Sequence, residues 1–139
     1  MPQPLIDSAA PVDDEAADDA AALLPLDPER LDCYRIAVEF QVLASTLLPT
    51  DQRVLRDQLE RASVSIVLNI SEGCGRRARR DKARFYAMAR GSAMECAAII
   101  NLVLLRDLAP YLDCRRGRSL IVRLVQMLTK LQLTMRGRL

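Results

Sequence analysis

The 139-residue sequence contains no histidine and no tryptophan. Without histidine, the chain lacks the side chain that most often serves as a general base, a metal ligand or a pH switch. Its aromatic residues are two Phe and three Tyr, so a core would consist mainly of Leu, Ile, Val, Ala and Met. That composition suits packed helices better than sheets.

Closely spaced cysteines and long apolar runs are also missing. Cys33, Cys74, Cys96 and Cys114 form no C-x-x-C pair, which indicates reduced thiols rather than a zinc site. We find no run of roughly 18 apolar residues for a membrane span, and no basic start with an apolar centre for a signal peptide. We therefore expect a cytoplasmic protein that needs no metal or cofactor.

Charge is divided unevenly along the chain, although the net charge is only +2. Residues 1–32 carry nine acids and one base, a net charge of −8, whereas residues 33–139 carry nine acids and nineteen bases, a net charge of +10. Prolines and an Asp/Ala-rich composition in residues 1–29 predict a disordered acidic tail. Residues 30–139 are long enough to form one folded domain.

Four segments repeat apolar residues at helical spacing. The predicted helices span about residues 28–48, 51–72, 79–108 and 115–135. The third starts between Arg79 and Lys82, and the fourth starts at Arg115 or Gly117. Helices of this length joined by short loops predict an all-α fold, an antiparallel up-down-up-down four-helix bundle.

Capping residues and apolar stripes add detail to these helices. Asp27 and Thr50 are the predicted N-caps of the first two, and Gly73 fits a left-handed glycine that ends the second. One predicted face of the first helix comprises Leu31, Tyr34, Val38, Gln41, Val42 and Ser45, widened by Ile36, Phe40, Leu43 and Leu47. The other predicted stripes are Leu55, Leu59, Ala62, Ile66 and Ile70; Phe85, Ala89, Ser92, Cys96, Ile99 and Val103; and Ile121, Leu124, Leu128, Leu131 and Met135.

The most distinctive residues lie at the end of the second predicted helix and along the third. Residues 65–77 read SIVLNISEGCGRR, and residues 85–95 read FYAMARGSAME. Their patterns, S-x-x-x-N-I-x-E-G-x-G-R and A-R-G-S-x-x-E, together resemble the four-helix-bundle family of 23S rRNA intervening-sequence proteins, over residues 30–139. The motif residues, which we interpret as structural, are Ser65, Asn69, Glu72, Gly73, Gly75, Arg90, Gly91, Ser92 and Glu95.

This resemblance implies a homopentamer whose biochemical role is largely undefined. A distant branch, the accessory proteins of diversity-generating retroelements, implies association with a reverse transcriptase and nucleic acid. The implied partners are therefore further copies of the chain and RNA or DNA, a reverse transcriptase or another nucleic-acid-handling protein, with no membrane. The chain departs from the family at Ala78, where a Ser or Thr would form a capping box with Asp81. We predict that the third helix starts frayed, or starts later with Asp81 as its cap.

The motif glycines and polar residues allow two interpretations. Gly73 and Gly75 either end a helix and reverse the chain, or cradle a phosphate before a helix start. If the second and third helices reverse near residues 74–79, Ala62 lies opposite Gly91, and small residues let the helices approach closely. In that register Ser65, Asn69, Ser92 and Glu95 are predicted to form a polar seam, either within one protomer or between protomers.

A cluster of bases around the start of the third helix is the best functional clue. Six bases and one acid, Asp81, occupy nine residues: Arg76, Arg77, Arg79, Arg80, Lys82 and Arg84. Exposed cations at a helix N-terminus cost roughly 0.3–1 kcal/mol each, so a bound anion would relieve the conflict. The chain's last bases, Arg136 and Arg138, are predicted to return to the same end. A solvated run of charge is the alternative.

These features favour a non-enzymatic oligomeric protein. It would bind nucleic acid, or a nucleic-acid-handling protein, through its arginine-rich end; the alternative is a protein-interaction scaffold without nucleic-acid binding. No catalytic set is recognisable, and aromatic residues near the arginines are limited to Phe85 and Tyr86, so little base reading is expected. The acidic residues 7–29 are expected to fold back over the arginines and compete with anionic partners.

Overall fold

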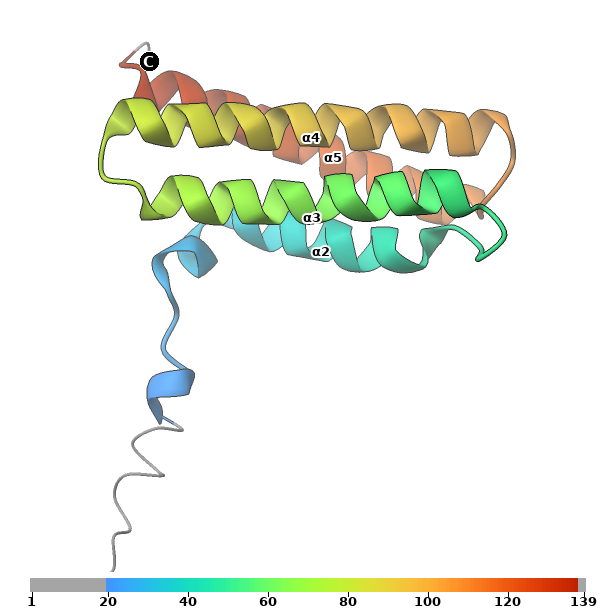
Figure 1. The fold of residues 1–139 in the computed structure, drawn as a ribbon, viewed down its shortest axis with the longest axis horizontal. Coiled ribbons are helices and arrows are strands. Elements are labelled where there is room, and N and C mark those ends of the chain that lie inside the picture. The colour runs from blue at the N-terminus through green and yellow to red at the C-terminus, as the bar shows by residue number, and fades with distance from the viewer. Residues whose placement is uncertain (1–19, 138–139) are drawn as a thin grey trace, which may run out of the picture.

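The computed structural model describes residues 20–137, and this part of the chain contains helices and turns but no strand. The four long helices are α2 (Asp32–Leu47), α3 (Arg53–Gly75), α4 (Arg79–Leu105) and α5 (Tyr111–Met135). A 3₁₀ helix, η1 (Asp27–Arg30), precedes them. The long helices pack side by side in one bundle, as Figure 1 shows. The predicted all-α class with four packed helices is confirmed.

Each long helix packs against two of the others. Helix α3 contacts α2 and α4, while α5 contacts α4 and α2, so the four helices surround one core. Most of the predicted acidic tail, residues 1–19, lies outside the described residues, as does Arg138. The chain enters α2 at the end of the bundle that also holds the α3–α4 turn and the end of α5 (Figure 1).

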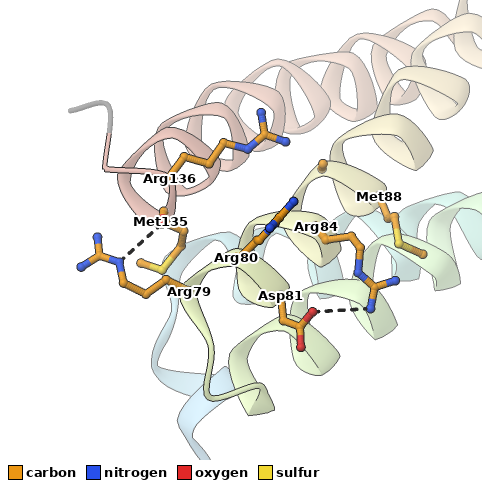
Figure 2. Close-up of a pocket in the computed structure, with 8 residues that line it drawn as sticks. Arg79, Arg80, Asp81, Arg84, Met88, Met135 and Arg136 are labelled. Atoms are coloured by element: carbon orange, nitrogen blue, oxygen red, sulfur yellow. Dashed lines mark hydrogen bonds and ion pairs between the residues drawn. The ribbon is translucent and has the colours of Figure 1, made fainter.

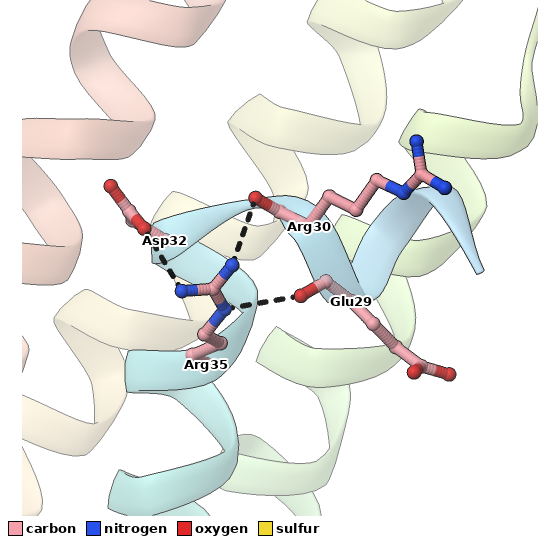
Figure 3. Close-up of polar contacts among 4 residues, drawn as sticks. All are labelled: Glu29, Arg30, Asp32 and Arg35. Carbon is pink, nitrogen blue, oxygen red and sulfur yellow. Dashed lines mark hydrogen bonds and ion pairs between the residues drawn. The ribbon is translucent and has the colours of Figure 1, made fainter. Parts of the chain in front are cut away.

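An arginine clamp joins η1 to α2. The Nε of Arg35 donates a hydrogen bond to the carbonyl oxygen of Glu29 at 3.1 Å, and its Nη2 donates to that of Arg30 at 3.4 Å. The same guanidinium pairs with Asp32 at 3.6 Å, as Figure 3 shows. The first turn of α2 thereby fixes where the preceding chain leaves the bundle.

The core confirms three of the four predicted stripes. Leu59 and Ile66 of α3, Val103 of α4 and Leu124 of α5 are fully buried, and the remaining apolar stripe residues of these helices are buried or pack against the core. Helix α2 differs from the prediction, because Val42 remains 62 % exposed. The buried face of α2 comprises Cys33, Ile36, Ala37, Phe40, Ala44 and Leu47. This face carries Phe40, so turning it inward removes more apolar surface from water.

Several predicted helix ends are wrong. Neither Asp27 nor Thr50 caps a helix, because α2 starts at Asp32 after η1 and α3 starts at Arg53. Helix α5 begins at Tyr111, well before Arg115, since the carbonyl of Pro110 already accepts a hydrogen bond from the Cys114 amide at 3.1 Å. These predicted helix starts were wrong because they relied on side-chain caps, whereas backbone hydrogen bonds define the observed starts.

Helix α4 also ends earlier than predicted, at Leu105 rather than Leu108. Asp107 adopts a left-handed conformation with φ of 53°, and the Leu108 amide donates to the carbonyl of Val103 at 3.0 Å. This six-to-one bond belongs to the Schellman type of helix end. An aspartate tolerates the left-handed region better than most residues, so the turn forms without glycine.

Gly73 serves a packing role and does not end α3. The helix continues to Gly75, and among residues 20–137 only Asp107 and Gly137 have positive φ, so the predicted left-handed conformation is wrong. A Cβ on Gly73 would lie 3.0 Å from the Cβ of Phe85 and 3.0 Å from Cε1 of Tyr86. The missing side chain therefore lets α4 approach the end of α3.

Gly91 lies on the opposite, exposed side of α4, which corrects the predicted close contact with Ala62. A Cβ added there would meet nothing within 4 Å. The small residues that are buried between the helices are Ala62 on α3 and Ala89 and Ala93 on α4. The prediction that small residues lie between α3 and α4 is thus correct for Ala62, but Gly91 is not one of them.

Helix α4 is long and apolar enough, by length and composition alone, to cross a membrane. The sequence had not suggested a span. A helix in the centre of a bundle meets the same criterion, and α4 packs against both α3 and α5. Its apolar composition follows from this double contact.

Gly73→Ala should destabilise the fold, whereas Gly91→Ala should stabilise it. Both changes improve helix propensity by about 0.5–1 kcal/mol, but only at Gly73 does the new methyl group overpack a buried contact, at a cost of about 1–3 kcal/mol. Urea denaturation followed by circular dichroism would measure both variants. A Gly73→Ala variant as stable as Gly91→Ala would contradict the close-packing role.

The four free cysteines should differ in reactivity. Burial raises the pKa of Cys33 to about 11 and that of Cys96 to about 12, whereas Cys74 is partly exposed. Because the thiolate is the reactive form, iodoacetamide at pH 8 should modify Cys74 in the folded protein and leave the buried thiols intact. Peptide mass spectrometry would report the labelled site. Native labelling of Cys33 at the rate of Cys74 would contradict the buried position.

Candidate functional site

The start of α4 lies beside the C-terminal ends of two other helices. Lys82 donates from Nζ to the carbonyl oxygens of Cys74 at 2.7 Å and Gly73 at 3.3 Å, both in the last turn of α3. Arg79 donates from Nη2 to the carbonyl of Thr134 at 2.6 Å and from Nε to that of Met135 at 3.4 Å, in the last turn of α5. Cations stabilise these negative helix ends.

These contacts change the interpretation of the basic cluster. The bases were predicted to conflict with the N-terminal end of their own helix. Two of them, Arg79 and Lys82, instead satisfy carbonyl groups of neighbouring helices, so the fold itself explains their presence. The bases available to bind an anion are therefore the others in the cluster, which do not hold a neighbouring helix end.

Two further arginines flank the ring of Phe85. The guanidinium carbon of Arg76 lies 4.8 Å from the ring centroid, and that of Arg84 lies 4.7 Å from it. Arg76 also pairs with Glu72 at 2.6 Å, and Arg84 pairs with Asp81 at 3.8 Å. Exposed ion pairs add little stability, but stacking together with pairing restricts the orientation of both guanidiniums.

The lost capping box does not shift the start of α4 to Asp81, which was one of the two predicted outcomes. The helix begins at Arg79, with Ala78 in the cap position and no side-chain cap. Asp81 lies in the first turn and pairs with Arg84, one turn further along. An acid in the first turn suits the positive end of the helix, so Asp81 stabilises the start without capping it.

A groove lies between the start of α4 and the end of α5, and we call it the arginine groove. Its volume is about 1000 Å³, and Figure 2 shows its lining side chains. The lining residues are Arg79, Arg80, Asp81, Arg84, Ala87, Met88, Met135 and Arg136. Four guanidiniums and one carboxylate give the groove a net charge of +3. Such a concave basic surface attracts anions.

Arg80 and Arg136 distinguish this groove from a structural cluster. Neither side chain makes a hydrogen bond or an ion pair within residues 20–137, and both are exposed. They come from different helix ends, far apart in the sequence, and Figure 2 shows them on facing sides of the arginine groove. The predicted return of Arg136 to the basic end is observed. Arg77 lies exposed in the α3–α4 turn and does not line the groove.

The motif residues hold α4 in register with its neighbours. The hydroxyls of Ser65 and Ser92 are 2.9 Å apart, and Asn69 donates to both the carbonyl and the hydroxyl of Ser65. On the other side of α4, Arg90 donates from Nε to the hydroxyl of Thr129 at 2.8 Å. Glu95 is exposed and makes no side-chain hydrogen bond or ion pair in the described part of the chain, so it does not join this seam within one protomer.

The remaining motif residues do not build a ligand site. Gly73 and Gly75 lie within α3 rather than in a loop before a helix start, so the phosphate-cradle interpretation is wrong. Residues 20–137 contain no group of three or more Cys, Asp or Glu side chains placed to hold a metal ion.

The sequence did not identify the apolar part of the arginine groove. Ala87, Met88 and Met135 line it together with the bases. Met88 follows Arg84 by four residues and therefore lies one helical turn away, which is the only sequence signal that could have indicated it. Met135 was predicted only as a core residue.

Arginines at the opposite end of the bundle make more local contacts. Arg116 pairs with Glu39 at 3.0 Å, and Arg118 donates to the side-chain oxygen of Asn101 at 3.0 Å. The basic character of that end is thus partly neutralised by the bundle itself. It offers a useful comparison for the arginine groove.

Arg79→Ala should lower stability, whereas Arg80→Ala should leave it nearly unchanged. Arg79 satisfies carbonyls at the end of α5, and removing that interaction should cost about 0.5–1 kcal/mol; Arg80 has no such contact. Chemical denaturation of both variants measures the difference. Equal stabilities would show that the bonds from Arg79 to α5 contribute nothing.

Comparison with known families gives one match. The family model for the 23S rRNA-intervening sequence protein matches residues 29–130. This range covers α2, α3, α4 and most of α5, and it includes Arg79, Arg80 and Arg84 of the arginine groove. No curated protein matches the chain.

Proposed function

Because the chain belongs to the family of 23S rRNA-intervening sequence proteins, we propose that it is a non-enzymatic, oligomeric nucleic-acid-binding protein. The observation that carries this proposal is the arginine groove, whose net charge is +3 and whose Arg80 and Arg136 have no partner within residues 20–137. Guanidiniums bind phosphate oxygens bidentately and keep their charge at any physiological pH. Phosphate contacts would therefore dominate the affinity.

The side chains of the groove also support a binding role rather than catalysis. They comprise arginines, one carboxylate, two methionines and an alanine, and that carboxylate is already paired with Arg84. A nucleophile with an adjacent base, or a pair of carboxylates with different pKa values, would be needed for common hydrolytic chemistry. The groove contains neither.

Self-association is the second part of the proposal, as an up-down-up-down bundle that forms a homopentamer. Helix α4 exposes Met94 at 50 %, Leu102 at 46 % and Leu105 at 85 %, and these residues form an apolar stripe along its outer side. Contiguous exposed apolar surface is typical of an interaction site. A ring would repeat the arginine groove in every copy and raise the affinity for a long polyanion.

The same apolar stripe favours the alternative function, a scaffold that binds another protein without nucleic acid. Mass measurement by light scattering would test the pentamer, and Leu102→Lys should reduce the mass if the stripe joins the copies. A protein partner that remains bound after nuclease treatment in high salt would support the scaffold instead.

Neutralising the arginine groove should weaken nucleic-acid binding and reduce its dependence on salt. For Arg80→Gln, Arg84→Gln and Arg136→Gln combined, the slope of log K against log salt should become shallower by about 1.4 to 2, since two or three lost phosphate contacts contribute about 0.7 each for a single strand. Fluorescence anisotropy with a labelled oligonucleotide at several salt concentrations measures this slope.

A control with the same change in net charge separates the groove from the overall charge. Arg106→Gln, Arg115→Gln and Arg123→Gln remove three exposed arginines that lie outside the arginine groove. The control variant should bind nearly as well as the unmodified protein. Equal losses in both triple variants would show that charge alone, and not the groove, determines binding.

A further inference from the structure

The arginine groove combines bases with an apolar wall. Figure 2 shows Met135 beside Arg79, Met88 beyond Arg84, and Arg80 and Arg136 between them. Met88 is 45 % exposed, although its helix could have placed a polar residue at this position. A site for phosphate alone gains nothing from an exposed thioether group, and Met135, on the other side, is partly buried. The apolar wall therefore indicates that the ligand carries an apolar surface next to its phosphates.

The aromatic side chains near the groove cannot contact the apolar surface of a ligand. Phe85 is only 9 % exposed and Tyr86 only 3 %, so neither ring can stack on a ligand. The guanidinium of Arg84 covers Phe85, yet the Arg84 side chain remains 60 % exposed. A planar guanidinium held in this way can stack on a base, and methionine sulfur also makes favourable contacts with aromatic rings.

We infer that the arginine groove binds single-stranded nucleic acid, with phosphates on Arg80 and Arg136 and a base against Arg84, Met88 and Met135. This inference rests on the proposed function and names the class of nucleic acid. A duplex presents phosphates while its base faces remain stacked inside, so it cannot use the apolar wall. A single strand presents phosphates and base faces together.

The groove also offers little for reading a base sequence. Its one carboxylate, Asp81, pairs with Arg84, and its other side chains are arginines, methionines and an alanine. Base discrimination depends on donors and acceptors placed against base edges, whereas the guanidiniums assigned above contact phosphates and the face of a base. Binding is therefore expected to tolerate changes of sequence, and to be similar for single-stranded RNA and DNA of the same length.

Competition and direct binding with three probes test the inference on the full chain. The probes are a single strand of about 16 thymidines, which spans the usual site sizes, the duplex of the same length with adenine, and inorganic polyphosphate. The single strand should bind more tightly than the duplex at the same salt concentration. Polyphosphate should compete only weakly, because it has charge but no bases. A strand of uridines in place of thymidines should bind equally well.

A matched pair of substitutions tests the apolar wall. Met88→Ser should weaken single-strand binding by about two- to tenfold, the range expected for a lost sulfur–aromatic contact, and leave duplex and polyphosphate binding unchanged. Val122→Ser is the control, because Val122 is also 45 % exposed but lies on α5 outside the groove. Light scattering should show the same mass for both variants, so that altered assembly does not imitate a lost contact.

The outcomes separate this inference from the function on which it rests. Duplex binding as tight as single-strand binding, or equal effects of Met88→Ser and Val122→Ser, would overturn the single-strand assignment and leave phosphate binding intact. If none of the three probes bound at low salt, nucleic-acid binding itself would be overturned, and the scaffold alternative would remain.

Discussion

The hydrogen bonds from the start of α4 to the last carbonyls of α3 and α5 organise the basic end of this protein. Lys82 reaches α3 and Arg79 reaches α5, so the positive side chains of one helix satisfy the negative ends of two others. Without these bonds, the carbonyls of Cys74 and Met135 would have no hydrogen-bond partner within residues 20–137, whereas those of Gly73 and Thr134 also accept a backbone amide. Some of the bases at this end therefore have a structural origin, and the binding surface that we propose lies beside them.

This arrangement also explains how the groove acquires its charge. Arg79 must point toward α5 to reach its carbonyls, and the end of α5 brings Arg136 to the same place. Arg80 is the next residue of α4, and Arg84 lies one turn further along. Electrostatic repulsion between these guanidiniums is tolerated because the surface is exposed and partly screened by Asp81 and the helix ends. The same repulsion is relieved further when phosphates bind.

The sequence predicted the helices well and their ends poorly. Periodic leucine, isoleucine and alanine residues identified α3, α4 and α5, because burial of one face controls a helix more strongly than its caps. In α2, two apolar stripes compete, and only the packed structure shows that the face with Phe40 is buried. The helix ends depend on backbone bonds and on close contacts such as Gly73 with Phe85 and Tyr86, which no single-sequence pattern records.

For the candidate site, the sequence located the correct end of the bundle but not the roles of its residues. Counting bases could not separate Arg79 and Lys82, which hold the helices together, from Arg80 and Arg136, which do not. That distinction depends on which backbone carbonyls lie within hydrogen-bonding distance of each base. The turn between α3 and α4 sets those distances. Met88 and Met135 escaped notice for the same reason, since an exposed methionine has no signature of its own.

The order in which the helices touch has a consequence for how the chain folds. Three of the four helix contacts join neighbours in the sequence, and only the contact between α2 and α5 closes the bundle across the whole domain. Local contacts of this kind form quickly, since little chain entropy is lost in closing short loops. The seam between the first and last long helices should accordingly be the last to assemble and the first to open. A chain still emerging from the ribosome can pack α2, α3 and α4 together before α5 is available to make that seam.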